Sequence, residues 1–267
     1  MANDTQTVPS NAATDSVVRA ALLIIGNEIL SGRTQDKNLS HIALTLNEVG
    51  IRLSEVRVVP DIEAEIVDAV NALRRRFDYV FTTGGIGPTH DDITSECIAK
   101  AFGQKLIVNP EARRRLQEHY NRTGMELNAM RLRMANTPEH ATLIDNPVST
   151  APGFRVENVF VLAGVPKIMQ VMLDGVKGSL KGGAPVLSRA ITCQMGEGIM
   201  AAGLQAIQNR YPQVDIGSYP YYRRSGYGTT IILRHTEAAS LQQAGDEVAA
   251  MMRDLGAEPY EGEPPPD

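Results

Sequence analysis

The sequence predicts a three-layer α/β/α domain with a mainly parallel sheet, followed by a small α+β domain. The first observation is an apolar run without alternation at residues 20–25, which is typical of a strand covered on both faces. The second is a repeated order of strand, glycine turn and helix, which favours parallel strands joined by crossover helices. The third is a glycine-rich stretch at residues 177–187, which predicts a linker between the domains.

The elements of the first domain, expected over 17–176, follow from apolar spacing and from the turn residues at their ends. The expected helix at 38–49 stops at Gly50, a good residue after a helix end. Asn109, Pro110 and Glu111 have the order of a cap, a first-turn proline and a first-turn acid. The other expected elements are strands at 19–25, 51–59, 77–82, 141–144, 154–156 and 159–162, and helices at 62–76, 93–101, 125–134 and 166–176.

The second domain is expected over 188–257. Its pattern predicts strands at 190–194, 214–218 and 229–234 and helices at 198–211 and 237–255. Residues 1–16 are rich in small polar residues and are expected to form a disordered leader. The proline-rich residues 258–267 are expected to form a disordered tail.

Composition argues against several classes of function. The chain has 267 residues and a formal net charge of -5, so it lacks the basic field expected of a protein that binds nucleic acid. Its two cysteines, Cys97 and Cys193, lie far apart, which argues against a disulfide framework or a zinc site and favours a reducing cytoplasm. No apolar stretch is long enough to span a bilayer, so we expect no membrane partner.

The stretch 79–94 predicts a buried strand, a glycine-rich turn and the first turn of a helix. This order places backbone N–H groups around a concave anion site, which suits a phosphate. Asp91 and Asp92 stand at its mouth, and carboxylates repel phosphates unless a proton or a divalent cation lies between them. The sequence therefore predicts a metal-assisted phosphate site.

Each part of this stretch also has a purely structural interpretation. Gly84, Gly85 and Gly87 fit a tight turn that needs positive φ, and they match neither a Walker A loop nor the dinucleotide fingerprint. Asp92 is a candidate N-cap of the following helix. His90 is either a general base or a solvated turn residue.

Two clusters outside this stretch also have two interpretations. Arg113, Arg114 and Arg115, with Arg131 and Arg133, either line an anionic ligand or form solvated helix faces. The tyrosines within 219–227 either form a stacking surface or pack beside a turn.

The segment 83–94 resembles the signature of the MoaB/Mog-like molybdopterin-binding domain family, in the form of the N-terminal region of competence/damage-inducible protein A (CinA-like). Four other segments agree with that family in order and spacing. They are Gly26-Asn27-Glu28-Ile29-Leu30-Ser31-Gly32 with Asn38, Val59-Pro60-Asp61, Asp145-Asn146-Pro147 through Ala151-Pro152-Gly153-Phe154, and Leu162-Ala163-Gly164-Val165-Pro166. The resemblance covers residues 20–176, and the second domain is similar to the small domain that follows in the same proteins.

The resemblance implies roles for particular residues. Asp61 and Asp92 take the positions of the family's functional aspartates and, with Asp91 and Glu28, are the implied ligands of Mg²⁺ or another divalent cation, Mn²⁺ or Co²⁺. The implied phosphate or pterin-binding residues are Gly26, Asn27, Asn38, Thr83, Gly84, Gly85, Gly87 and Thr94, with Ala151, Pro152, Gly153, Gly164 and Pro166 as the opposite wall. Molybdopterin is an implied ligand, and a homo-oligomer is the implied assembly.

Four positions depart from the family's usual pattern. Asn27 stands where an aspartate is usual and Ile168 where a glutamate is usual, which removes two acid or metal-ligand groups. Ser149 replaces a usual glycine and Ala163 a usual proline. The nicotinamide-nucleotide deamidase domain that often ends longer family members is not expected here, so that activity is not carried over.

These observations lead to one expected function and two alternatives. Two carboxylates from different strand ends suit Mg²⁺, which bridges phosphate oxygens and polarises a water. We therefore expect a divalent-metal-dependent hydrolase of the phosphoanhydride bond in an ADP-ribose-like nucleotide. The first alternative is molybdopterin binding or adenylylation in molybdenum cofactor biosynthesis. The second is a non-catalytic module that binds a nucleotide or pterin.

Overall fold

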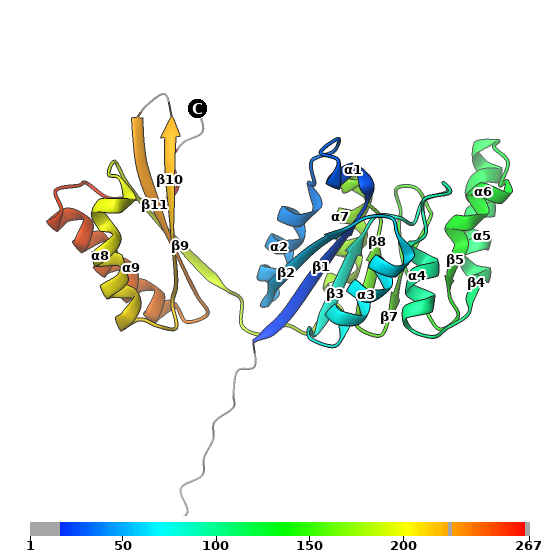
Figure 1. Ribbon diagram of the computed structural model, residues 1–267, viewed down its shortest axis with the longest axis horizontal. Helices are drawn as coiled ribbons and strands as arrows, with labels where there is room; N and C mark the ends of the chain where they lie inside the picture. Colours follow the sequence, from blue (N-terminus) through cyan, green and yellow to red (C-terminus); the bar gives the residue numbers. More distant parts are fainter. Residues whose placement is uncertain (1–16, 224–225, 265–267) are drawn as a thin grey trace, which may run out of the picture. The chain divides into compact units, whose positions relative to one another are not determined.

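A computed structural model describes residues 17–223 and 226–264. The chain divides into two compact units, residues 1–183 and 184–267, and the division falls inside the expected linker (Figure 1). The expected leader over 1–16 lies outside the described residues. Among the helices of the described ranges, none is long and apolar enough to cross a bilayer.

The first unit is built on a six-stranded sheet with the order β2-β1-β3-β8-β7-β6. Its first four strands run parallel, and β7 and β6 run antiparallel to them. The mainly parallel sheet is therefore confirmed. The strands are β1 (Val18–Ile25), β2 (Ile51–Val59), β3 (Tyr79–Thr83), β6 (Thr142–Ile144), β7 (Gly153–Val156) and β8 (Val159–Leu162).

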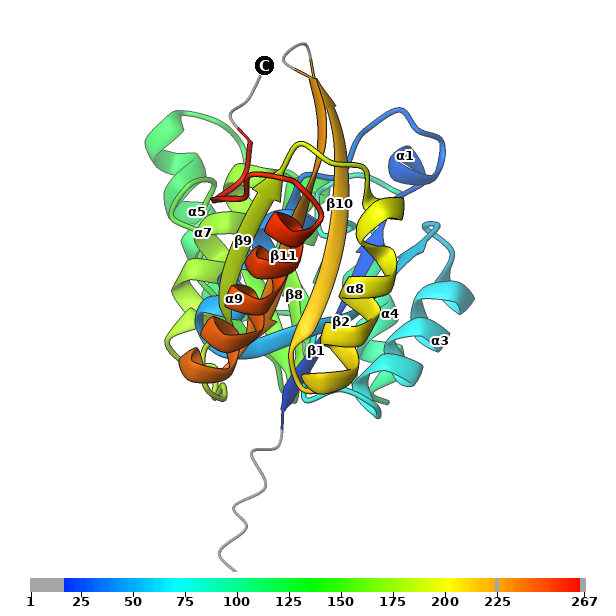
Figure 2. The same ribbon diagram turned by 90° about the vertical axis from the view of Figure 1, so that its left-hand side faces the viewer.

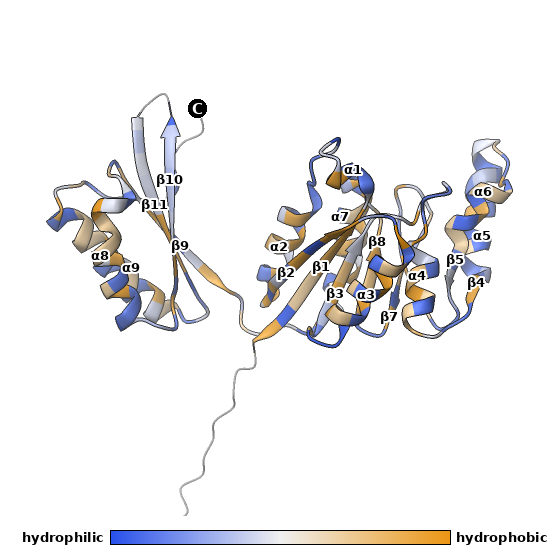
Figure 3. Cartoon of the chain, viewed as in Figure 1, coloured by the Kyte–Doolittle hydropathy of each residue, from blue (hydrophilic) through white to orange (hydrophobic). Residues whose placement is uncertain are grey.

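Helices cover both faces of this sheet, as the apolar run in β1 predicts. Leu23 and its odd-numbered neighbours pack against α3 (Glu63–Arg74) and α4 (Thr94–Ala101). Leu22 and its even-numbered neighbours pack against α2 (Asn38–Glu48) and α7 (Pro166–Lys177). Both leucines are fully buried, and burying such a side chain contributes about 1.5–3 kcal/mol. Figure 3 shows the apolar character of β1 between helices of mixed character.

A small excursion between α4 and β6 has its own apolar cluster around Leu116 and Tyr120. The expected helix at 125–134 is wrong at its start, because the helix begins at Ala129. The Asn128 side chain accepts the N–H of Arg131 and caps it there. The excursion consists of β4 (Leu106–Val108), α5 (Pro110–Thr123), α6 (Ala129–Leu132), the 3₁₀ turn η1 (Arg133–Ala135) and β5 (Asn136–Pro138).

The second unit is an antiparallel sheet with the order β10-β11-β9-β12 and two helices on one face (Figures 1 and 2). Its core lies between that face and the helices, around Ile191, Met200 and Val248. The small α+β domain is therefore confirmed. Its elements are β9 (Leu187–Cys193), α8 (Glu197–Arg210), β10 (Asp215–Arg223), β11 (Gly226–His235), α9 (Ala238–Asp254) and β12 (Tyr260–Glu261).

The tail contains a second correction. Disorder was expected over 258–267, but Tyr260 and Glu261 form β12 and pair with β9. The cause is a contact that the tail composition does not reveal: the guanidinium of Arg189 donates to the Glu261 carboxylate at 2.6 Å, and its Nη1 donates to Asp246 on α9 at 2.9 Å. Residues 265–267 of the expected tail lie outside the described ranges.

Candidate ligand site at the carboxyl ends of the parallel strands

All five sequence segments of the expected site meet at one edge of the first sheet. The parallel strands β1, β2, β3 and β8 end there, and the antiparallel β7 begins there. Two backbone bonds join neighbouring strand ends: the N–H of Gly26 donates to Val59 O at 3.2 Å, and the N–H of Gly84 donates to Leu162 O at 3.3 Å. In open α/β sheets this is the edge at which ligands bind.

The glycine turn after β3 is packed too closely for side chains. A Cβ on Gly84 would lie 2.2 Å from the carbonyl oxygen of Ile25, and one on Gly164 would lie 3.2 Å from Gly84 Cα. Gly84 and Gly85 also have φ values of 100 and 68, which favour glycine. The glycine turn therefore brings the ends of β1, β3 and β8 together. A tight turn and a ligand site are compatible interpretations of the same glycines.

Thr94 supports the glycine turn from beneath. Its hydroxyl donates to Gly84 O at 3.0 Å and its N–H donates to Gly85 O at 3.0 Å. A Cβ on Gly85 would lie 2.1 Å from the Thr94 hydroxyl oxygen. Because Thr94 is fully buried, it shapes the turn from inside the protein.

Asp92 is bound within its own loop. Its Oδ2 accepts the N–H of Thr89 at 2.8 Å and also the Thr89 hydroxyl. The N-cap interpretation of Asp92 is wrong, because α4 begins at Thr94, its N-cap position is Ile93, and no side chain caps it. The carboxylate lies beside Gly87, where a Cβ would approach Oδ2 to 2.6 Å. One carboxylate oxygen, Oδ1, is left for other partners.

The two neighbours of Asp92 at the loop tip are exposed. The His90 side chain is 93% exposed and that of Asp91 is 59% exposed, with 3.9 Å between them. Hydrogen bonding with Thr89 lowers the pKa of Asp91 from its ordinary value. This exposure favours the solvated interpretation of His90.

Asp61 braces the loop after β1. Its Oδ2 accepts the N–H of Asn27 at 2.9 Å, where the short helix α1 (Asn27–Leu30) begins. Glu28 folds back over Gly26, since a Cβ there would lie 2.5 Å from the Glu28 carboxylate. Asp61 and Glu28 therefore flank the same two residues, and the structure brings Gly26, Asn27 and these two acids together.

Buried polar atoms near the strand ends lack partners. Asn38 is 4% exposed, and its Nδ2 donates to Gly164 O at 2.8 Å, while its Oδ1 has no partner among the described residues. The hydroxyl of Thr83, at the end of β3, is likewise unpaired, as is that of Thr82. Leaving such a group unpaired costs about 1–3 kcal/mol, so a water or ligand group is the usual partner.

The wall from residue 145 to Gly153 is organised by Asn146, a residue of one of the five motifs whose role no sequence pattern indicates. Its Nδ2 donates to Ala151 O at 2.8 Å and to the Ser149 hydroxyl at 2.6 Å. A Cβ on Gly153 would lie 2.4 Å from Val161 O, so β7 and β8 approach closely here. Pro152 directly precedes β7, and Pro166 is the first residue of α7.

His119 on α5 is a neighbour of this wall that no sequence pattern indicated. Its Nδ1 lies 3.1 Å from the hydroxyl of Thr150. Thr150 has a φ of 69, which is unusual for a β-branched residue. Strain of this kind is often found at ligand sites.

Of the basic residues singled out by sequence, Arg133 alone is seen to contact the site loop among the described residues. Its Nη2 donates to the carbonyl oxygen of Asp92 at 3.1 Å. Arg114 binds Glu111, and Arg131 lies over the Tyr120 ring. Arg115 binds Glu111 and also pairs with Asp145, where the wall segment begins. A small hollow borders the Arg133 contact and is lined by Ile86, Gly87, Asp92, Ser95, Glu96, Arg133 and Asn136.

Ile168, where the family usually has glutamate, packs against the apolar core below the site. It therefore belongs to the packing of α7.

Within residues 17–223 and 226–264, no group of three or more His, Cys, Asp or Glu side chains is arranged to hold a metal ion.

Comparison with known proteins matches both units. The family model described as a probable molybdopterin binding domain matches residues 21–182, and that of the middle domain of FAD synthase matches residues 185–261. A protein of Pyrobaculum calidifontis is 33% identical over 245 residues, which cover 88% of this chain and 94% of that protein.

Two CinA relatives are similar to the first unit. A CinA-like protein of Geotalea uraniireducens is 41% identical over 161 residues, and the match spans 38% of that protein's length. The crystal structure of the protein CinA with unknown function from Thermoplasma acidophilum is 37% identical, with a TM-score of 0.56, and the match covers 60% of this chain and 96% of that one. The chain therefore belongs to the probable molybdopterin binding domain family, with CinA-like proteins among its relatives.

Proposed function

We propose that the strand-end loops bind the phosphate-bearing part of a nucleotide or pterin and, with a divalent cation, hydrolyse the phosphoanhydride bond of an ADP-ribose-like nucleotide. One observation carries the proposal. Asp61 and Asp92 lie on loops after two strands of one sheet, and in each a carboxylate oxygen accepts a backbone N–H. Each carboxylate is therefore oriented and keeps an oxygen for a ligand.

The glycine turn supplies the proposed phosphate contact. The Gly84 N–H is already bound to Leu162 O, so Gly84 shapes the turn, and the N–H groups of Gly85 and Gly87 are the proposed phosphate donors. The Asn38 Oδ1 and the Thr83 hydroxyl, which have no partner among the described residues, are the proposed acceptor and donor for a bound molecule or its waters. Ala151, Pro152 and Gly153, with Gly164 and Pro166, form the proposed facing wall.

The donor set suits a hard cation. No three acids of the described residues are arranged around one point, so Mg²⁺, Mn²⁺ or Co²⁺ would be held by one or two of the proposed ligands Asp61, Asp92, Asp91 and Glu28. Mg²⁺ usually takes only one or two carboxylates plus waters and phosphate oxygens. Such a cation neutralises phosphate charge and makes a bound water more acidic. Hydrolysis adds one water across the phosphoanhydride and gives two phosphomonoesters, AMP and ribose 5-phosphate in the case of ADP-ribose.

The test is turnover of ADP-ribose with each of the three cations, followed by separation of AMP. The Asp92→Asn and Asp61→Asn variants keep an oxygen that accepts the loop N–H but lose the charge, so we expect AMP formation to fall at least about a hundredfold. Asp174→Asn, an exposed position on α7, is the matched control and should retain activity. Wild-type protein that makes no more AMP than Asp92→Asn would refute hydrolysis.

A second candidate rests on the family match over residues 21–182: molybdopterin binding or adenylylation in molybdenum cofactor biosynthesis. It predicts pterin fluorescence that co-purifies with the protein, or complementation of a cofactor-deficient strain. If nucleotide or pterin raises the melting temperature equally with and without chelator, and no turnover occurs, the site is a binding module only.

We also propose a homo-oligomer in the cytoplasm. A monomer by light scattering at micromolar concentration would argue against that assembly.

A further inference from the structure

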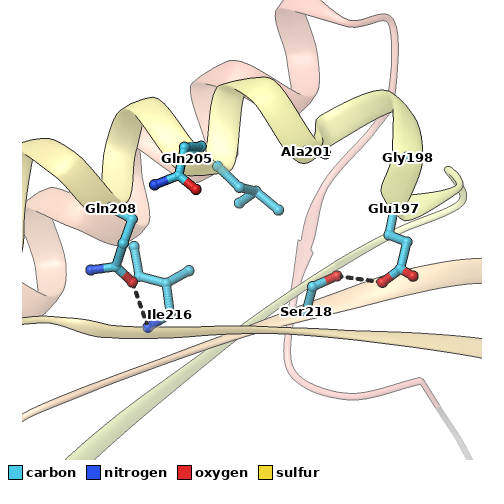
Figure 4. A pocket seen from close by; sticks show the side chains of 8 residues that line it. Glu197, Gly198, Ala201, Gln205, Gln208, Ile216 and Ser218 are labelled. Atoms are coloured by element: carbon cyan, nitrogen blue, oxygen red, sulfur yellow. Dashed lines mark hydrogen bonds between the residues drawn. The ribbon is translucent and has the colours of Figure 1, made fainter.

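A groove in the second unit lies between helix α8 and strand β10 (Figure 4). Its volume is about 370 Å³, and β10 is the edge strand of its sheet. One stripe of α8 and two alternate residues of β10 form the walls. The lining residues are Glu197, Gly198, Ala201, Leu204, Gln205, Gln208, Ile216 and Ser218.

The register of β10 determines which of its backbone groups face the open edge. The N–H of Ile216 donates to Gln208 Oε1 at 3.3 Å, so the backbone of residue 216 points away from β11. Backbone groups of a strand point to its two sides alternately, so Pro220, four residues after Ile216, is oriented as Ile216 is. Pro220 lies opposite Thr229 and has no N–H. Ser218 lies between these residues, so its N–H and C=O also face outward.

Gln208 already takes the place of a neighbouring strand at one end of this edge. Its Nε2 donates to Val214 O at 2.8 Å while its Oε1 accepts from Ile216, which are the two bonds that the N–H and C=O of one residue in an added parallel strand make. Pro220 ends the pairing on the other side. Between them lie the outward C=O of Ile216 and the outward N–H and C=O of Ser218.

The side chains of the groove set its chemical preference. Glu197 is the one charged group among the described residues that line it, and its Oε2 accepts the Ser218 hydroxyl at 3.0 Å. The other carboxylate oxygen is left for a cation at that end (Figure 4). Leu204 and Ile216 provide apolar walls further along.

We propose that this groove binds an extended peptide segment as an added strand on β10, with a basic side chain at Glu197 and an apolar one between Leu204 and Ile216. The span from Glu197 to Gln208 is about 16 Å of helix, which matches about five extended residues. Main-chain bonds to Ile216 and Ser218 give affinity, and the groove selects the alternate side chains.

The test selects random heptapeptides displayed on phage against the full chain and measures an enriched peptide by fluorescence anisotropy. We expect enriched sequences with lysine or arginine two residues from an apolar residue. Methylating the peptide amides one by one should weaken binding with a two-residue period, because only alternate N–H groups face β10.

Two variants separate the contributions of charge and backbone. Glu197→Gln should weaken binding at least about fivefold through loss of the charge pair. Ser218→Pro removes the outward N–H without removing a bond to β11, but it also removes the hydroxyl that Glu197 accepts, so it is compared with Ser218→Ala, which removes the hydroxyl alone. We expect Ser218→Pro to bind at least about fivefold more weakly than Ser218→Ala. Glu258→Gln, an exposed acid outside the groove, is the control and should bind as wild type.

Three results would each overturn the proposal: no enriched peptide, a methylation profile without the two-residue period, or binding unchanged in both groove variants. If Ser218→Pro fails to fold by circular dichroism, Glu197→Gln and the methylation profile still decide.

Discussion

The backbone N–H of Asn27 donates to Asp61 Oδ2 at 2.9 Å and joins two loops whose residues are 34 positions apart. Beside it, the N–H of Gly26 donates to Val59 O, so Asp61 lies where β1 and β2 separate. Asp61 therefore braces the edge of the sheet in addition to its proposed metal role. The two roles are separable by substitution.

Asp61→Asn should leave the free energy of unfolding within about 0.5 kcal/mol of wild type, because the amide oxygen still accepts the Asn27 N–H. Asp61→Ala should lower the free energy of unfolding by about 1 kcal/mol more than Asp61→Asn does, since the acceptor of the Asn27 N–H is lost. Both should abolish a rise in melting temperature on addition of Mn²⁺. Urea unfolding and thermal melts measure the two effects, and an Asp61→Asn protein still stabilised by Mn²⁺ would exclude Asp61 as a ligand.

Gly84→Ala should destabilise the protein far more than Gly103→Ala. Both glycines have positive φ, 100 and 62, but the added Cβ meets Ile25 O at 2.2 Å in the first case and nothing within 4 Å in the second. The clash should add about 1–3 kcal/mol to the strain that the two variants share. Equal midpoints in urea would show that the turn relaxes freely.

Thr94→Val should cost about 1–3 kcal/mol, because the partly buried Gly84 carbonyl loses its donor. Thr94→Ser keeps the hydroxyl and removes one methyl group, so it should cost only about 1 kcal/mol. The free energy of unfolding in urea gives both values. A serine variant as unstable as the valine variant would assign the effect to packing.

Sequence reasoning predicts the first unit well because its signals are local. The apolar run of β1 is covered on both faces, and turns after parallel strands necessarily share one edge. The short strand β12 escapes this reasoning because it depends on the Arg189–Glu261 bond, which spans 72 residues. The helix start at Ala129 depends on one cap, Asn128, in a segment whose apolar spacing continues past it.

The site is predictable in outline but not in the direction of its side chains. The loops of Asp61 and Asp92 are found from their motifs. However, the pairing of Asp92 with Thr89 competes with a helix cap that the sequence equally allows. The contact between His119 and Thr150 spans 31 residues and has no sequence signal, because α5 is otherwise a surface helix rich in charge.

Neither cysteine should react in the folded protein. Burial raises the pKa of the Cys97 thiol to about 12, so at pH 8 about one molecule in ten thousand carries the reactive thiolate. Cys193 is also fully buried. We expect no labelling by Ellman's reagent in native buffer and two thiols per chain in guanidinium, and rapid native labelling would contradict the burial of Cys97, of Cys193 or of both.

Glu111 should make stability depend on acid pH. Hydrogen bonds from Arg114 and then Arg115 lower the pKa of this carboxyl from 4.5 to about 2. Its stabilisation is therefore fully present above pH 4.5 and is lost as the pH falls toward 2, because the unfolded chain takes up the proton first. Glu111→Gln should unfold at lower urea concentration than wild type at pH 7, and the difference should shrink steadily between pH 5 and pH 3. Glu126→Gln, exposed in the α5–α6 connection, is the control, and a Glu111→Gln difference that does not change with pH would show that charge pairing with the arginines is not its cause.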